Sequence, residues 1–134
     1  MIRQVFYISR AVAGLDEGAV QAILAVSRKN NWRADVTGIL MSAGSHFAQV
    51  LEGRAADIEP LLAKVVADRR HDHVRVLLDR TATLRQYGDW SMGYFYKSAL
   101  AEELFALSTA TERSETDVLN FFEFLRADTV MGAL

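Results

Sequence analysis

Hydrophobic and polar residues follow one another along the first 96 residues in patterns that predict alternating strands and helices. Five segments rich in β-branched and aromatic residues are expected to be strands: residues 2–9, 36–41, 46–51, 74–78 and 90–95. Two segments have apolar residues at intervals of three and four, which is typical of helices: residues 15–31, and a stretch that ends near Arg69. This order predicts an α+β fold of the ferredoxin-like βαββαββ type, with two helices on one face of the sheet.

The first predicted strand is apolar on both faces, which indicates a central position in the sheet. Val5, Tyr7 and Ser9 share one face, while Phe6 and Ile8 share the other. In the predicted strand 90–95, alternation places Trp90, Met92 and Tyr94 together on one face. Pro60 is the only proline, and we expect it in the first turn of the second helix, where its missing N–H is not needed.

Polar side chains interrupt two of these apolar faces. Gln49 points to the same side of its strand as Phe47 and Leu51, and the apolar stripe of helix 15–31 continues into Ser27 and Asn31. Burying an amide without a partner costs about 1–3 kcal/mol, so each buried amide needs a hydrogen bond. A flat heterocycle with its own donors and acceptors would be a suitable partner in the space between sheet and helices.

Each of these polar residues also has an ordinary structural explanation. Tyr7 can be a core tyrosine with a satisfied hydroxyl, and Asn31 can be the C-cap of its helix. Gln49 can be a residue on the solvent side of its strand. Spacing alone therefore predicts an α+β domain with a possible pocket.

The last third of the chain has a different pattern. Helices are expected at residues 99–108 and 115–127, the second opening on a near capping box, Ser114 and Asp117. Phe121, Phe122 and Phe124 lie within four positions, and one helix face covers only about 100°. At least one of these rings must pack outside a single stripe, on the open face of the sheet, on a second copy of the chain, or on both.

Composition excludes several classes of protein. The chain has 134 residues, enough for one domain with a core, and a net charge of −2 with scattered Lys and Arg, unlike a nucleic-acid footprint. It has no cysteine, so disulfides and thiolate chemistry are excluded. The N-terminus lacks the pattern of a signal peptide, and no apolar run reaches the roughly 18 residues that a membrane helix needs. We expect a cytoplasmic protein.

Five motifs make the chain similar to a known family: VFYISRA (5–11), SRKNNWRADVTGILM (27–41), GSHFAQVLEG (44–53), DRRHDHV (68–74) and DWSMGY (89–94). Together they span about the first 96 residues, and with their spacings they resemble the BLUF family, the sensors of blue light that use FAD. The resemblance implies non-covalent binding of FAD. FMN would also be accommodated, because the slot mainly holds the ring.

The resemblance also implies roles for individual residues. Tyr7 corresponds to the redox tyrosine, Gln49 to the glutamine between that tyrosine and the flavin, and Trp90 and Met92 to the signal-relaying WSM motif. The remaining cofactor-binding positions implied by it are Ile23, Ser27, Asn30, Asn31, Phe47, Lys64, Val65, Asp68, Arg70 and His71. Lys64 stands where some members have arginine; it keeps the charge and loses the planar fork.

The implied mechanism is photochemical rather than catalytic. Light drives electron and proton transfer from Tyr7 to the flavin, and the Gln49 amide then presents a changed set of hydrogen bonds to the flavin edge. Such a change gives a small red shift of the absorption spectrum. A bistable element reads the new arrangement and transmits the signal.

Four other hypotheses can be set beside this one. A small hydrolase of acylphosphatase type shares the fold, but the residues after Ser9 offer Arg10 without a Gly-rich phosphate loop. A dimerising scaffold with an empty slot is the second. His71 and His73 form a possible metal pair without an evident third ligand, and Glu52 a possible general base without a partner.

The resemblance implies a sensory domain at residues 1–96, and the helical pattern after it predicts an output and assembly extension at residues 97–134, within one compact unit. The extension is too short for a catalytic domain. We therefore expect no enzyme activity, signalling to a downstream effector protein in trans, and a homo-oligomer, either a dimer or larger. Neither nucleic acid nor membrane is expected as a partner.

Overall fold

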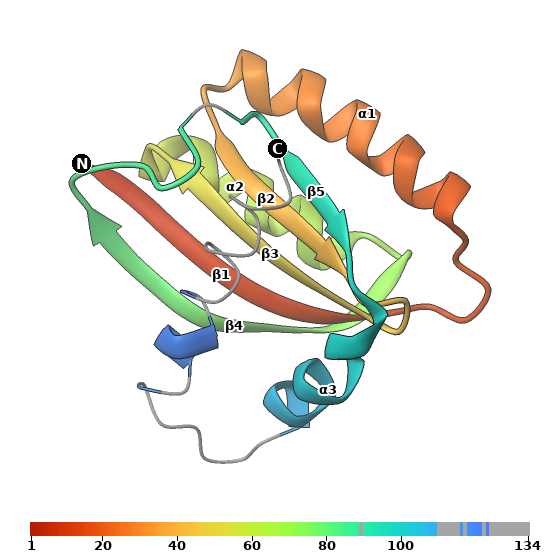
Figure 1. Cartoon of the computed structure of the whole chain (residues 1–134). Helices are drawn as coiled ribbons and strands as arrows, with labels where there is room; N and C mark the ends of the chain where they lie inside the picture. The colour runs from red at the N-terminus through yellow and green to blue at the C-terminus, as the bar shows by residue number, and fades with distance from the viewer. Residues whose placement is uncertain (89, 110–115, 117, 122, 124–134) are drawn as a thin grey trace.

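The computed structural model describes residues 1–88, 90–109, 116, 118–121 and 123. Its elements are β1 (Ile2–Ala11), α1 (Glu17–Arg33), β2 (Thr37–Ser42), β3 (His46–Gly53), α2 (Ala55–Ala67), β4 (His71–Ala82), β5 (Gly93–Tyr96), the 3-10 helix η1 (Ser98–Leu100) and α3 (Ala101–Thr109). Residues 116, 118–121 and 123 are helical as well. Figure 1 shows the sheet between the α1–α2 layer and α3.

The five strands form one mixed sheet in the order β4-β1-β3-β2-β5. The pairs β1–β3, β1–β4 and β2–β3 are antiparallel, and β2–β5 is parallel. This is the predicted ferredoxin-like plan with one added strand, so the predicted fold class is confirmed. β1 occupies a central position, as its two apolar faces predicted.

The two faces of the sheet carry separate apolar cores. The slot face, toward α1 and α2, includes Val5, Tyr7, Leu40, Phe47 and Leu51. The open face, toward α3, includes Phe6, Ile8, Ile39, Met41 and Val50. The alternation of β1 across the two faces is as predicted, since side chains of successive strand residues point to opposite sides.

The C-terminal residues cover the open face. Leu100 and Leu104 are buried against it, and so are Val118 and Phe121. The Phe121 ring stacks on Phe6 with a centroid distance of 6.1 Å. Phe121 therefore packs on the open face, one of the two destinations expected for these aromatic residues, while the prediction that at least one of the three rings leaves a common stripe stays a prediction. The predicted capping residues Ser114 and Asp117, with Phe122 and Phe124, lie outside the described residues.

Two local predictions were wrong. Pro60 lies inside α2, not in its first turn, because the helix begins five residues earlier, at Ala55. β5 begins only at Gly93, so Trp90 and Met92 precede the strand and do not share a face. Trp90 packs against the open-face core, whereas Met92 is buried in the slot-face core.

The other element boundaries differ from the predictions by a few residues, most at β4. That strand runs from His71 to Ala82 instead of covering only residues 74–78, because pairing with the long β1 extends it at both ends. No helix in the described part of the chain is long and apolar enough to cross a membrane.

Candidate functional site

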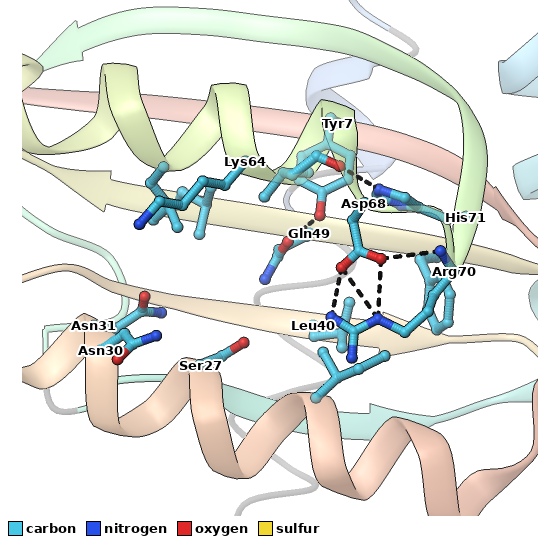
Figure 2. Close-up of a pocket in the computed structure, with 15 residues that line it drawn as sticks. Tyr7, Ser27, Asn30, Asn31, Leu40, Gln49, Lys64, Asp68, Arg70 and His71 are labelled. Atoms are coloured by element: carbon cyan, nitrogen blue, oxygen red, sulfur yellow. Dashed lines mark hydrogen bonds and ion pairs between the residues drawn. The ribbon is translucent and has the colours of Figure 1, made fainter.

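A cavity of about 200 Å³ lies over the slot face, between α1 and α2 (Figure 2). Its walls combine apolar side chains from both helices and the sheet with polar side chains gathered at its ends and floor. The lining residues are Tyr7, Ile23, Ser27, Asn30, Asn31, Leu40, Phe47, Gln49, Leu51, Leu61, Lys64, Val65, Asp68, Arg70 and His71.

A chain of three hydrogen-bonding side chains starts at the floor of the cavity. Tyr7 and Gln49 are direct partners in the β1–β3 register, so their side chains leave the sheet side by side. The Tyr7 hydroxyl donates to Gln49 Oε1 (Figure 2). Gln49 Nε2 in turn donates to the sulfur of Met92 at 3.4 Å. The amide therefore connects the tyrosine to the segment before β5.

The Tyr7 phenol is held neutral. Its side chain is buried, and burial raises the pKa of the hydroxyl above its ordinary value, with the nearby negative charge of Asp68 acting in the same direction. The phenol, which is protonated at neutral pH even at its ordinary pKa, therefore keeps its proton to still higher pH and can act as a hydrogen-bond and proton donor to Gln49.

Polar residues of α1 form one wall of the cavity. Asn31 is buried, and its Nδ2 donates to the carbonyl oxygen of Ser91 at 2.9 Å. This bond directs the amide so that Oδ1 remains as an acceptor. Ser27 lies one turn earlier on the same helix, and Figure 2 shows both side chains on the cavity side of α1.

Charged residues gather at the other end of the cavity, after α2. Arg70 donates to Asp68 through Nε at 2.9 Å and through Nη2 at 2.6 Å. The side-chain hydrogen bond from Arg70 lowers the pKa of Asp68, so this carboxylate is ionised at neutral pH. Lys64 makes no hydrogen bond or ion pair to any residue that the structure describes, and its exposed ammonium is available for an anionic group.

His71 closes the cavity near Tyr7, where its ring lies edge-on to the Tyr7 ring, with centroids 6.2 Å apart. One ring nitrogen is 2.7 Å from Ser9 Oγ and the other 2.6 Å from the Val65 carbonyl oxygen. His73 instead contacts Asp72, is exposed, and has a positive φ of 52°. The two histidines thus have separate partners, and the described residues contain no group of three potential metal ligands.

The cavity brings together all the residues predicted to bind the cofactor, along with Tyr7. Two structural alternatives are wrong: Gln49 is only 8% exposed rather than on the solvent side, and Asn31 lies within α1, which continues to Arg33. Leu40, Leu51 and Leu61 also line the cavity but were not predicted. Of these three, Leu51 could have been predicted, because it lies two residues after Gln49 on the same face of the strand.

Glu52 performs a structural task instead of acting as a base. It is fully buried near the open face, where it accepts hydrogen bonds from the backbone N–H groups of Gln86 and Tyr87, both at 2.8 Å. Gln4 Nε2 donates to the same carboxylate at 2.8 Å. Glu52 therefore fastens the loop between β4 and β5 to β3.

This cavity fits a flat heterocycle with polar edges. Apolar side chains form walls from both helices, while Asn31 and Gln49 present amide groups and Lys64 and Arg70 present cations at the rim. A flavin has this combination of an aromatic ring and an anionic tail. The fold and the cavity thus define a small ferredoxin-like domain of flavin-binding type.

Comparisons with known proteins identify the family. A family model described as "Sensors of blue-light using FAD", BLUF, matches residues 2–93. The chain belongs to the BLUF family, whose cofactor is FAD. A BLUF domain is itself a sensor and not a catalyst.

Several relatives illustrate the range of this family. Photoactivated adenylate cyclase subunit beta of Euglena gracilis is 35% identical over 94 residues, which cover 68% of this chain and 11% of the relative. The Escherichia coli antirepressor BluF, regulated by blue light and temperature, is 33% identical over 76 residues, or 57% of this chain and 19% of the relative. The chain thus spans about a tenth to a fifth of these relatives.

Solved structures match nearly the whole chain. The dark-state structure of BlrB, a BLUF protein, has a TM-score of 0.79 at 28% identity and covers 95% of this chain and 96% of its own. The photo-activated state of BlsA has a TM-score of 0.78 at 23% identity, with coverage of 94% and 95%. The second likeness supports the fold.

Proposed function

We propose that this chain is a blue-light photoreceptor in which Tyr7 and Gln49 carry the light response. The observation that supports this most directly is the hydrogen bond from the buried Tyr7 hydroxyl to Gln49 Oε1 on the floor of the cavity. When bound, FAD supplies a ring that absorbs blue light and accepts an electron once excited. Asn31 and Gln49 would orient this ring through their amides, and Lys64 and Arg70 would hold the anionic tail.

In this proposal Tyr7 would supply an electron, and its hydroxyl proton would pass along the existing hydrogen bond and through the Gln49 amide, so that electron and proton both reach the cofactor and later both return to Tyr7. The neutral phenol, whose pKa burial raises further, carries the proton that this transfer requires. Gln49 then changes the donor and acceptor that it presents at the cavity. Because Nε2 of the same amide donates to Met92, the rearrangement also changes the contact with the segment before β5.

The test is absorption spectroscopy on the purified full chain before and after blue light. The wild type should be yellow and show a reversible red shift. Tyr7→Phe should keep the flavin and lose the shift, because only the hydroxyl is removed. Gln49→Ala should lose it too, because the switchable amide is gone.

Tyr94→Phe is the matched control for the loss of a tyrosine hydroxyl. Tyr94 lies on β5 and donates to Glu17 at 3.1 Å, away from the cavity lining. This variant should keep both the flavin and the shift. A full reversible shift in Tyr7→Phe or Gln49→Ala would contradict the assigned mechanism, and a colourless wild type that takes up no added flavin would contradict the function itself.

We also propose that the signal leaves the sensor, residues 1–96, through the C-terminal residues 97–134. Leu104 and Phe121 cover the open face, where Trp90 packs as well, so a change at the segment before β5 adjoins this extension. The chain would then act without an enzyme activity of its own, in the cytoplasm, on an effector protein in trans. The relatives, named as a photoactivated adenylate cyclase subunit and a light-regulated antirepressor, illustrate outputs of two kinds.

Self-association through this extension is part of the proposal. Phe122 lies outside the described part of the chain, so the test variant is placed at Phe105 on α3 instead. Phe105 is 56% exposed. Phe105→Glu should therefore lower the average mass in light scattering without changing the flavin spectrum. Truncation after Tyr96 is a poorer test, because it uncovers the apolar open face. A wild-type monomer at tens of micromolar would contradict the assembly role.

A further inference from the structure

The segment just before β5, residues 90–92, is held by three donors that belong to β2 and α1. Gly38 N donates to the Trp90 carbonyl at 3.1 Å. Asn31 Nδ2 donates to the Ser91 carbonyl at 2.9 Å, and Arg28 Nε donates to the Met92 carbonyl, also at 2.9 Å. Three consecutive carbonyls are thus satisfied, two of them by side chains one turn apart on α1.

These bonds determine where the Met92 side chain lies. A thioether sulfur is a weak acceptor, so the 3.4 Å contact from Gln49 cannot by itself hold Met92 beside Gln49 in the slot-face core. Trp90, two residues earlier, packs on the opposite face of the sheet. The backbone between the two side chains therefore crosses from one face to the other, and its carbonyl contacts fix which side chain reaches Gln49.

We propose that Arg28 is a positioning residue that holds the Met92 carbonyl and so keeps the Met92 sulfur next to Gln49. Arg28 is not among the residues that line the cavity, so it acts through Met92 and not by touching the cofactor. The light-dependent part of this proposal rests on the proposed function. The arrangement with Met92 at Gln49 is the state that Arg28 stabilises, and loss of Arg28 slows the return to it after illumination.

The first test measures the position of Met92 without light. The full chain has four methionines, so methyl-labelled methionine gives few NMR signals, and Met92→Leu identifies the one from Met92. Arg28→Leu keeps an apolar stem and removes the donor. It should shift or broaden the Met92 signal while leaving that of Met41, on the open face, in place.

Lys29→Leu is the matched control, because Lys29 is the next residue of α1, is exposed, and carries the same charge. It should leave the Met92 signal unchanged. An identical Met92 signal in wild type and Arg28→Leu would overturn the proposal, and so would an equal change in Lys29→Leu.

The second test measures the dark recovery of the red-shifted spectrum after a blue pulse. Arg28→Leu should recover about two- to tenfold more slowly, the range for one hydrogen bond, with the size of the shift retained. Arg28→Lys keeps a donor and should recover at an intermediate rate, and Lys29→Leu at the wild-type rate. Wild-type recovery in Arg28→Leu would overturn the proposal. A wild type without any shift would contradict the proposed function instead, and the Met92 signal would still decide the role of Arg28.

Discussion

Replacing Glu52 by glutamine should destabilise the protein by about 2–4 kcal/mol, although the change removes no bulk. Glu52 is fully buried on β3. Its Oε2 accepts from Gln4 Nε2 and from Gln86 N, both at 2.8 Å. Its Oε1 accepts from Tyr87 N at 2.8 Å and from Thr37 Oγ1 at 3.4 Å. Both oxygens of the carboxylate therefore face a backbone N–H.

The magnitude follows from the donor count. A glutamine has one acceptor oxygen and one NH₂ group, so in either orientation its NH₂ meets the N–H of Gln86 or of Tyr87. A buried donor without an acceptor costs about 1–3 kcal/mol, and the loss of charge-assisted bonds adds to this. Rotating the Gln4 amide would not supply the missing acceptor, because Gln4 Oε1 already accepts a hydrogen bond from Arg80 Nε at 2.7 Å.

Urea unfolding of the full chain, followed by circular dichroism, measures this free energy. Glu103→Gln makes the same chemical change at an exposed position of α3 and should alter stability by no more than about 0.5 kcal/mol. If Glu52→Gln stayed within that limit too, the loop between β4 and β5 would not depend on this carboxylate, and the reasoning would be refuted.

Three further predictions concern the same scaffold. Burial lowers the pKa of His46 from 6.5, so the unfolded chain binds more protons and stability should fall as the pH drops below about 6.5; His46→Gln should flatten this dependence in urea unfolding. Gly38→Ala would place a Cβ 2.0 Å from the Val50 carbonyl oxygen and should lower stability by at least about 3 kcal/mol, measured by thermal unfolding. Phe121→Glu, at a buried ring, should cost about 3–5 kcal/mol in the same assay, and Phe105→Glu, at an exposed ring, much less.

Strand period and helix period, read from the sequence, placed residues of the cavity floor and of the α1 wall, whereas the charged end of the cavity was expected only from the family resemblance. Tyr7 and Gln49 were each assigned to one face of a strand by alternation, and the structure places them opposite each other in the β1–β3 register. The stripe through Ile23, Ser27 and Asn31 likewise faces the cavity. These assignments succeed because a period of two or 3.6 residues is a local property of the backbone.

Only the tertiary structure decided how the segment before β5 runs. Alternation placed Trp90 and Met92 on one face, yet they lie on opposite faces, because Arg28 and Asn31 of α1 hold the carbonyls of this segment outside any regular strand. Glu52 is another example, since the two backbone N–H groups that donate to it belong to residues more than 30 positions away. Such contacts depend on the packing of elements that are distant in the sequence, and the local periodicity of a strand or helix does not determine that packing.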